Sequence, residues 1–337
     1  MCTALNLSLD GEVFFGRNLD LNCGFGEEVV VTPRNYPFTF SDGSHLASHH
    51  AMIGMATVVN DYPLYAEGSN EKGLSIAGLN FPGNAYYFPP KPGKTNVSPY
   101  ELIPWLLGNF ATLAEVRTAL AELNLTDIAF SPQMPLAPLH WLVADATGAL
   151  VIESTADGLH WYENPFGVLT NNPPFPYHLE NVKQYLHLSA DWPENRIVPE
   201  IPLQPVGVGF GSVGLPGDTS PASRLVRAAF LRSATLNSRD VLPGGQPLSD
   251  GENLAAVGQF FRILANVAMV KGSTRNEQGT NEYTVYSCCC DVSRGIYYYT
   301  TYENLSLTAV DMHKTDLESA TLARYPLART QEVVRQN

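Results

Sequence analysis

Positive charge is scarce in this sequence. Its 20 Lys and Arg residues stand against 33 Asp and Glu, which gives a formal net charge of −13 over 337 residues. Phosphate binding needs clustered cations, so this balance excludes a nucleic-acid partner. Charged residues make up 16% of the chain and apolar residues 45%, a composition typical of a well-packed globular protein.

Long apolar runs are missing as well. The longest ones, such as 51–59 and 260–270, are too short or too interrupted to cross a bilayer. The N-terminus lacks the basic segment and apolar core of a secretion signal. We therefore expect a cytoplasmic protein without a membrane partner, of a length that allows one large domain or two ordinary ones.

Metal and nucleotide motifs are absent or incomplete. The five cysteines, at positions 2, 23, 288, 289 and 290, form no disulfide framework, and three in a row lack the spacing of a zinc site. We expect Cys23 and 288–290 to be structural. The histidines also lack metal spacing. Residues 209–214 formally match G-x-G-x-x-G, but the Leu-Pro-Gly-Asp that follows breaks a helix, so no dinucleotide site is predicted.

What the sequence does contain begins at its second residue. Cys2 follows the initiator methionine and is small enough for Met1 to be trimmed, which would leave an α-amine and a thiol on one residue. An α-amino group titrates near about 7.7–8.0, so it can serve as the base for its own thiol. Many proteins carry a small residue at this position, so Cys2 alone does not establish a nucleophile.

The next residues predict a hairpin. Asp10-Gly11 lies between two apolar runs, a strong signal for a tight turn between two strands. The returning strand would bring Arg17 and Asp20 back toward Cys2, where a guanidinium favours thiolate and a carboxylate can orient the amine. The alternative is that Arg17 and Asp20 form an ordinary surface ion pair.

Strands and helices alternate in blocks along the rest of the chain. Capping signals predict helices that start near Ser98 and at Thr112, the latter running to Leu123. We expect 60–70 to be irregular, 81–97 to be a loop and 192–218 to be a packed excursion rather than a linker. Antiparallel runs interrupted by pairs of helices favour stacked sheets covered by helices, an α+β fold. Further helices are expected at 177–188, 221–234 and 251–270, and further strands at 28–34, 51–59, 74–80, 139–144, 150–154, 159–163, 168–170, 282–291, 295–304 and 307–312.

Three more polar residues are candidates for a site. Asn80 and Asn171 each end an apolar strand, where an amide can hold a developing oxyanion. Asn171-Asn-Pro is equally a turn sequence. Arg224 lies in the first turn of a predicted helix, where the dipole disfavours a cation, so it is there for charge contacts or is simply solvated.

Taken together, these segments resemble the choloylglycine hydrolase family, which includes conjugated bile acid hydrolases and penicillin V acylases. The resemblance runs nearly from end to end. Its motifs are Met1-Cys-Thr, Phe15-Gly-Arg-Asn-Leu-Asp, Thr32-Pro-Arg-Asn-Tyr, Asn70-Glu-Lys-Gly-Leu, Ala77-Gly-Leu-Asn-Phe-Pro, Pro138-Leu-His-Trp, Gly167-Val-Leu-Thr-Asn-Asn-Pro, Gly214-Leu-Pro-Gly-Asp, Ala222-Ser-Arg, Glu282-Tyr-Thr-Val-Tyr and Ile296-Tyr-Tyr-Tyr.

The resemblance implies one N-terminal nucleophile hydrolase domain over 1–337, Met1 removed, folded as a four-layer αββα sandwich of antiparallel sheets and assembled as a homotetramer. It also implies amide hydrolysis through a thioester, with no metal or organic cofactor. Conjugated bile salts are the expected substrates because Asn80 is typical of bile-acid hydrolases, whereas penicillin V acylases often carry Tyr there. The alternatives are a penicillin V acylase and a non-catalytic carrier of apolar ligands.

The resemblance also assigns roles to particular residues. Cys2 would be the nucleophile, with the oxyanion site made by Asn80 and Asn171. The charged residues around the nucleophile would be Arg17, Asp20 and Arg224. Candidate apolar walls for the steroid, with plain core packing as the alternative, are Leu19, Phe25, Met55, Ile128, Phe130 and Leu136.

Overall fold

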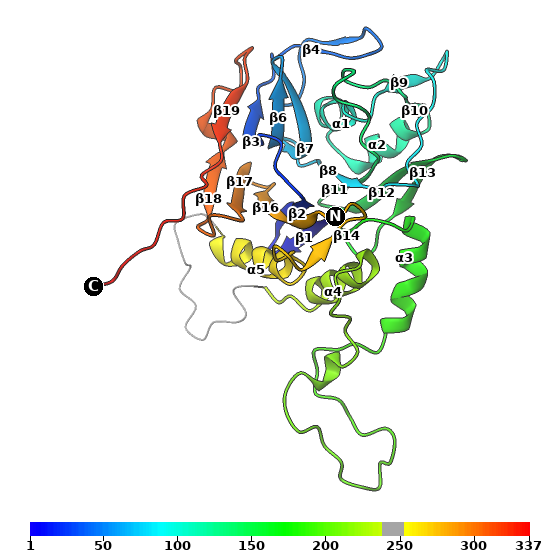
Figure 1. Cartoon of the computed structure of the whole chain (residues 1–337), viewed down its shortest axis with the longest axis vertical. Helices are drawn as coiled ribbons and strands as arrows, with labels where there is room; N and C mark the ends of the chain where they lie inside the picture. Colours follow the sequence, from blue (N-terminus) through cyan, green and yellow to red (C-terminus); the bar gives the residue numbers. More distant parts are fainter. Residues whose placement is uncertain (238–252) are drawn as a thin grey trace.

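A computed structural model describes residues 1–237 and 253–337 and contains two large antiparallel sheets (Figure 1). The seven-stranded sheet has the order β14-β1-β2-β16-β17-β18, with β15 paired to β16. Its strands are β1 (Cys2–Leu9), β2 (Glu12–Leu21), β14 (Val168–Leu169), β15 (Thr274–Arg275), β16 (Asn281–Asp291), β17 (Ile296–Thr301) and β18 (Thr308–Asp311).

The second sheet has eight strands in the order β13-β12-β11-β8-β7-β6-β3-β19. They are β3 (Glu28–Thr32), β6 (Met52–Val59), β7 (Tyr62–Asn70), β8 (Ser75–Asn80), β11 (Leu139–Asp145), β12 (Gly148–Thr155), β13 (Gly158–Glu163) and β19 (Ala323–Pro326). Two small pairs accompany them, β4 (Phe38–Thr39) with β5 (His45–Leu46) and β9 (Thr95–Val97) with β10 (Leu123–Leu125).

Helices cover the outer face of each sheet (Figure 1). Helices α1 (Leu102–Asn109) and α2 (Leu113–Leu120) pack on the eight-stranded sheet, and α4 (Pro221–Ser233) and α5 (Leu254–Ala265) pack on the seven-stranded sheet. Helix α3 (Phe175–Val182) follows β14 and leads into a short 3-10 turn at Lys183–Tyr185. The predicted α+β fold with four αββα layers is confirmed.

Three apolar clusters hold the layers together. One lies between the two sheets and includes Cys2, Leu19, Met55 and Tyr286. The other two lie between each sheet and its helices. At about 25 cal/mol per Å² of apolar surface, burial of this kind is the main force that stacks the sheets. Polar side chains that enter the first cluster therefore need partners inside it.

The predicted opening hairpin is present. Strands β1 and β2 pair in the register Cys2↔Leu19, and the turn has positive φ at Asp10 (55°) and Gly11 (83°). These left-handed values at both central residues are those of a type I′ turn, which the Asp-Gly pair favours. The register brings the end of β2 alongside Cys2.

One strand was missed. The segment 60–70 was expected to be irregular, but residues Tyr62–Asn70 form β7, which pairs with β6 across a second tight turn at Asn60 (φ 50°) and Asp61 (φ 60°). Pro63 is the second residue of β7, close to the start of the strand, where sheets tolerate a proline. Opposite β6, β7 contributes three buried polar residues, Glu67, Ser69 and Asn70.

The excursion at 192–218 is not packed. It leaves the body of the molecule between α3 and α4 (Figure 1), and its apolar side chains are exposed, with Ile197 at 91% and Val206 at 92%. The prediction that this segment packs on the domain is therefore wrong. Helix boundaries also differ from the prediction: α1 starts at Leu102, and α2 ends at Leu120, before β10. The last predicted helix, 251–270, begins outside the described residues and is observed as Leu254–Ala265.

Among the described residues, none of the helices has the length and apolar character that crossing a membrane requires.

Candidate active site

Cys2 is the first residue of β1 and is 2% exposed. Its backbone N–H donates to Asn171 Oδ1 at 2.8 Å. Asn171 lies just after β14, the strand that pairs with β1 on the side opposite β2. The central strand therefore presents its N-terminal residue to a side chain that arrives from a neighbouring strand end.

Asn171 also joins the two sheets. Its Nδ2 donates to the backbone carbonyl of Asn80 at 2.7 Å, at the end of β8 in the eight-stranded sheet. The backbone carbonyl of Asn171 in turn lies 3.0 Å from His178 Nε2 on α3. Both predicted asparagines are thus brought together at one edge of the sandwich, so a turn role alone does not describe Asn171.

Arg224 completes a tight cluster around Cys2. It is fully buried, so the solvated alternative is excluded. Its Nη1 donates to the Cys2 carbonyl at 2.5 Å and to Thr3 Oγ1 at 2.7 Å, and its Nη2 donates to Asn171 Oδ1 at 2.8 Å. Burial lowers the pKa of Arg224, while electrostatic interactions with Asp20 and Cys2 act in the opposite direction.

Asp20 is equally buried. Its Oδ1 accepts from Thr284 Oγ1 at 2.6 Å, and its Oδ2 has no hydrogen-bond partner among the described residues. Burial raises the pKa of Asp20, and Arg224, Thr284, the N-terminal amine and Arg17 oppose that rise. A buried oxygen without a donor, beside the N-terminus, is suited to accept from an amine.

Arg17 points into the space between the two sheets. Its Nη1 donates to the carbonyl of Gly78 at 2.5 Å and lies 3.8 Å from Glu67 Oε2. Burial acts to lower the pKa of Arg17, but electrostatic interactions with Cys2, Tyr286 and Glu67 outweigh it and raise the pKa. Arg17 and Asp20 are both fully buried, so the surface-pair alternative is wrong.

Met1 remains attached in this structure, and its amine donates to the Asp20 carbonyl at 2.6 Å and to Glu282 Oε2 at 2.9 Å. Beside it is a cavity of about 300 Å³. Its walls come from Met1 itself, from the ends of β8 and β14, and from the β15–β16 hairpin, and they include Asn80, Asn171, Asn172, Arg275, Asn276 and Glu282. Because Met1 forms part of the wall, its removal would enlarge this cavity.

The six apolar residues predicted as substrate walls do not line that cavity. Leu19 and Met55 belong to the buried cluster between the sheets, which is the core-packing alternative. Phe130 packs edge-on against Tyr100, with ring centroids 5.3 Å apart, and Phe25 is 60% exposed. Ile128 and Leu136 are half-buried.

Sequence reasoning missed several residues of the site. Thr3, Thr284 and Glu282 contact Arg224, Asp20 and the Met1 amine, respectively. Thr284 and Glu282 come from β16, more than 260 residues after β1. The motif Glu282-Tyr-Thr-Val-Tyr contains both residues, but only the pairing of β16 with β2 places them beside the strand that pairs with that of Cys2 and gives them their partners.

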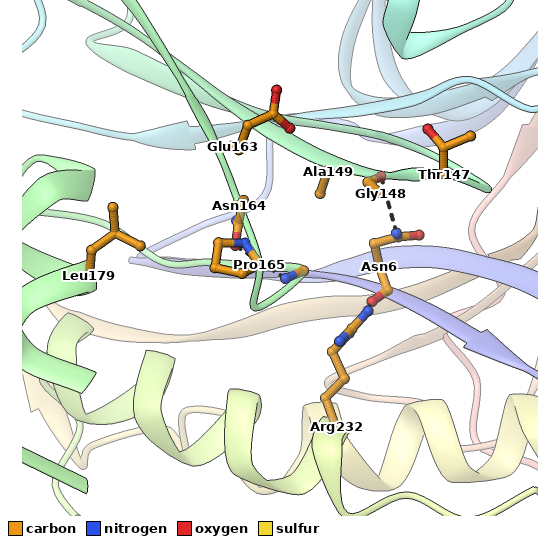
Figure 2. A pocket seen from close by; sticks show the side chains of 10 residues that line it. Asn6, Thr147, Gly148, Ala149, Glu163, Asn164, Pro165, Leu179 and Arg232 are labelled. Carbon is orange, nitrogen blue, oxygen red and sulfur yellow. Dashed lines mark hydrogen bonds between the residues drawn. The ribbon is translucent and has the colours of Figure 1, made fainter. Parts of the chain in front are cut away.

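A larger cavity of about 540 Å³ lies elsewhere (Figure 2). Its walls come from β1, the β11–β12 turn, the 163–167 loop, α3 and α4. Arg232 reaches up from α4 and donates through Nε to the carbonyl of Asn6 at 2.5 Å. None of the catalytic residues predicted from the sequence lines this cavity, whereas Asn80 and Asn171 both line the cavity beside Met1.

An αββα sandwich with a buried cysteine at the start of a central strand, enclosed by Arg17, Asp20, Asn171 and Arg224, defines an N-terminal nucleophile hydrolase. Residues 2–325 match the model of the linear amide C–N hydrolases of the choloylglycine hydrolase family. The chain belongs to this family.

Two curated relatives support the assignment over the whole chain. A bile salt hydrolase/transferase from Lactiplantibacillus plantarum is 46% identical over 97% of both chains. One from Clostridium perfringens is 40% identical over 98% of both.

Solved structures agree with this. A variant of the conjugated bile acid hydrolase from Clostridium perfringens superposes with a TM-score of 0.88 at 39% identity, covering 100% of both chains. A penicillin V acylase from Agrobacterium tumefaciens, at 20% identity and a TM-score of 0.75 over 98% of this chain and 92% of its own, shares the fold.

Proposed function

We propose that this protein hydrolyses the amide bond of glycine- and taurine-conjugated bile acids. The observation that carries the proposal is the convergence of Asn171 and Arg224 on the backbone of Cys2, at 2.8 and 2.5 Å. The relatives named as bile salt hydrolases, at 46% and 40% identity, support the substrate class.

The reaction begins once Met1 has been removed. The freed α-amine takes the proton of the Cys2 thiol, and the thiolate attacks the amide carbonyl to form a C–S bond. The amides of Asn80 and Asn171 stabilise the resulting oxyanion, and Asp20 Oδ2 accepts from the protonated amine. The C–N bond then breaks as the amine passes its proton to the departing glycine or taurine.

Water completes the cycle. The same amine takes a proton from a water molecule, whose oxygen attacks the thioester carbonyl, and the C–S bond breaks to release the bile acid. The thiol regains its proton from the amine. Every proton moves through Cys2 itself, so the proposed cycle uses no metal and no organic cofactor.

The decisive experiment compares two substrate classes. Release of glycine and taurine from conjugated bile salts is measured beside release of 6-aminopenicillanic acid from penicillin V. We expect the bile salts to be turned over with the larger kcat/KM. Negligible turnover of bile salts would sink the proposal, and faster turnover of penicillin V would establish the acylase instead.

Maturation and assembly are tested on the same preparation. Intact mass should show that active enzyme lacks Met1, because an acylated Cys2 nitrogen has no free lone pair to act as base. Fully active protein that retains Met1 would contradict the mechanism. We also propose a cytoplasmic homotetramer, as the family resemblance implies, and light scattering after gel filtration gives its mass.

A further inference from the structure

A second charged residue lies behind Arg17. Glu67, on β7, is as deeply buried as Arg17, with both side chains 1% exposed, and Glu67 Oε2 is 3.8 Å from Arg17 Nη1. The two residues come from different sheets: Arg17 is on β2 of the seven-stranded sheet, and Glu67 is on β7 of the eight-stranded one. Each side chain extends into the space between the sheets and contacts residues of the opposite sheet.

Arg17 is anchored by backbone carbonyls of the opposite sheet. Its Nη1 donates to Gly78 at 2.5 Å and to Ala66 at 3.3 Å. The register of β6 and β7 pairs Met55 with Glu67 and Ala56 with Tyr65, so Ala66 is the extra residue of a β-bulge. A bulge releases its residue from the regular ladder and re-aims nearby groups. Here it turns one carbonyl and the adjacent carboxylate toward the same guanidinium.

Glu67 is anchored by side chains of the first sheet. Tyr286 donates to Oε2 at 2.7 Å, Tyr297 donates to Oε1 at 2.6 Å, and the Cys288 thiol lies 3.5 Å from Oε1. Burial raises the pKa of Glu67, and Arg17 together with these donors opposes that rise. Since three donors converge on two oxygens, the site is built for a carboxylate rather than for a carboxylic acid.

The buried pair of Arg17 and Glu67 is not an efficient way to stabilise the fold, because both charges lose their hydration. A buried ion pair rarely stabilises more than apolar residues of the same volume. Arg17 also keeps one buried donor, Nη2, without a partner among the described residues. A structural arginine would satisfy all its donors, whereas one reserved for a charge that forms during reaction need not.

We propose that Glu67 is a positioning residue that orients the guanidinium of Arg17 behind the nucleophile and offsets its charge. Cys2 pairs with Leu19 and Ala4 pairs with Arg17, so the Arg17 side chain lies diagonal to Cys2 on the same face of the sheet. Arg17 interacts electrostatically with both Cys2 and Glu67. The standing charge of Glu67 limits how strongly Arg17 stabilises the thiolate, so the sulfur keeps its reactivity. The inference rests on the proposed role of Cys2 as nucleophile.

Glu67→Gln tests it because glutamine keeps the volume and one acceptor but loses the charge. The first readout is alkylation of Cys2 by iodoacetamide, followed in the N-terminal peptide by mass spectrometry across pH. With the offsetting charge gone, the midpoint of the pH profile should move to lower pH by about one unit. Glu67→Asp keeps the charge, so its midpoint should lie close to that of the wild-type protein.

The second readout is turnover of a glycine-conjugated bile salt, expressed per alkylatable Cys2. The new amide places an N–H₂ against a tyrosine hydroxyl or the guanidinium, so Arg17 shifts slightly. We expect kcat to fall about 10- to 100-fold while KM changes less than about threefold. The slight shift of Arg17 affects Cys2 less than the loss of the Glu67 charge does. The midpoint of the alkylation profile is therefore still expected to move to lower pH.

Tyr65→Phe is the matched control. Tyr65 lies two residues from Glu67 on the same strand, is buried, and bonds Thr32 on the other face of the sheet at 2.7 Å. The Tyr65→Phe variant should leave both the alkylation midpoint and kcat unchanged.

The proposal is overturned if Glu67→Gln leaves the alkylation midpoint in place or moves it to higher pH. A loss confined to the fraction of alkylatable Cys2, with normal kcat per thiol, would likewise reduce Glu67 to a structural residue. Alkylation needs no substrate, so failure on bile salts alone counts against the proposed function and not against the role of Glu67.

Discussion

The side-chain oxygen of Asn171 accepts the backbone N–H of Cys2 at 2.8 Å, although 169 residues separate them in the chain. The same oxygen accepts Arg224 Nη2 at 2.8 Å. One amide thus orients both the backbone nitrogen of Cys2 and the guanidinium that binds the Cys2 carbonyl. Three predictions concern this cluster, and a fourth concerns a buried carboxyl elsewhere in the fold.

Asn171→Ala should lower kcat about 10²- to 10³-fold, because it removes an oxyanion donor and the acceptor that orients the Cys2 nitrogen. The fall in kcat is measured from the steady-state release of glycine from a glycine-conjugated bile salt. Asn172→Ala is the control: Asn172 lines the same cavity and donates to Pro82 at 2.6 Å, but it does not contact Cys2. Equal losses in the two variants would show that the cavity wall, and not the Cys2 contact, is responsible.

Cys2→Ala should abolish turnover to below about a thousandth of the wild-type rate, because no other thiol can replace it. Burial raises the pKa of each of the Cys288, Cys289 and Cys290 thiols, so these stay protonated and inert. Cys23→Ala, at the exposed free cysteine, should leave the rate unchanged. Residual activity in Cys2→Ala that survives removal of contaminating enzyme would rule out the nucleophile.

Arg224→Met should lower the free energy of unfolding by about 3–5 kcal/mol, because it leaves the buried acceptors on Cys2 and Asn171 without their donor and weakens the electrostatic compensation of Asp20. Urea denaturation measures the loss. Adding Asp20→Asn should recover part of it, which a double-mutant cycle quantifies. Arg227→Met, on the same helix but half-exposed, should cost no more than about 1 kcal/mol. Additive losses from Arg224 and Asp20 would mean that the two are not coupled.

Stability should depend on pH through Asp291, at the end of β16 away from the thiol. Burial, helped by the charge of Glu12, raises the pKa of Asp291 to about 6, against the opposing effect of Arg294. A carboxyl whose pKa is higher in the folded state stabilises the fold when protonated, so that contribution is lost as pH rises from about 4 through about 6. Asp291→Asn should remove this slope from the unfolding free energy and leave kcat unchanged. An unaltered slope would assign it to another group.

Short sequence patterns were sufficient to predict several elements of the fold. Asp10-Gly11 predicted the first hairpin because a type I′ turn needs positive φ at both residues, a property of those two residues alone. The capping box at Thr112 predicted the start of α2 for the same reason: both hydrogen bonds lie within four residues. The β7 strand was missed because 60–70 was expected to be irregular, and the strand is defined by its pairing with β6 rather than by a local signal.

By itself, the sequence determined the family, the αββα class and the identity of Cys2, Arg17, Asp20, Asn171 and Arg224 as the residues to examine. Only the tertiary structure decided which charges are buried and which partners they have. Glu67 looks like any surface glutamate in the sequence, and Arg17 looks like half of an exposed ion pair. Desolvation and partner choice depend on which strands meet across the sandwich, and that is set by packing of distant segments rather than by neighbours in the chain.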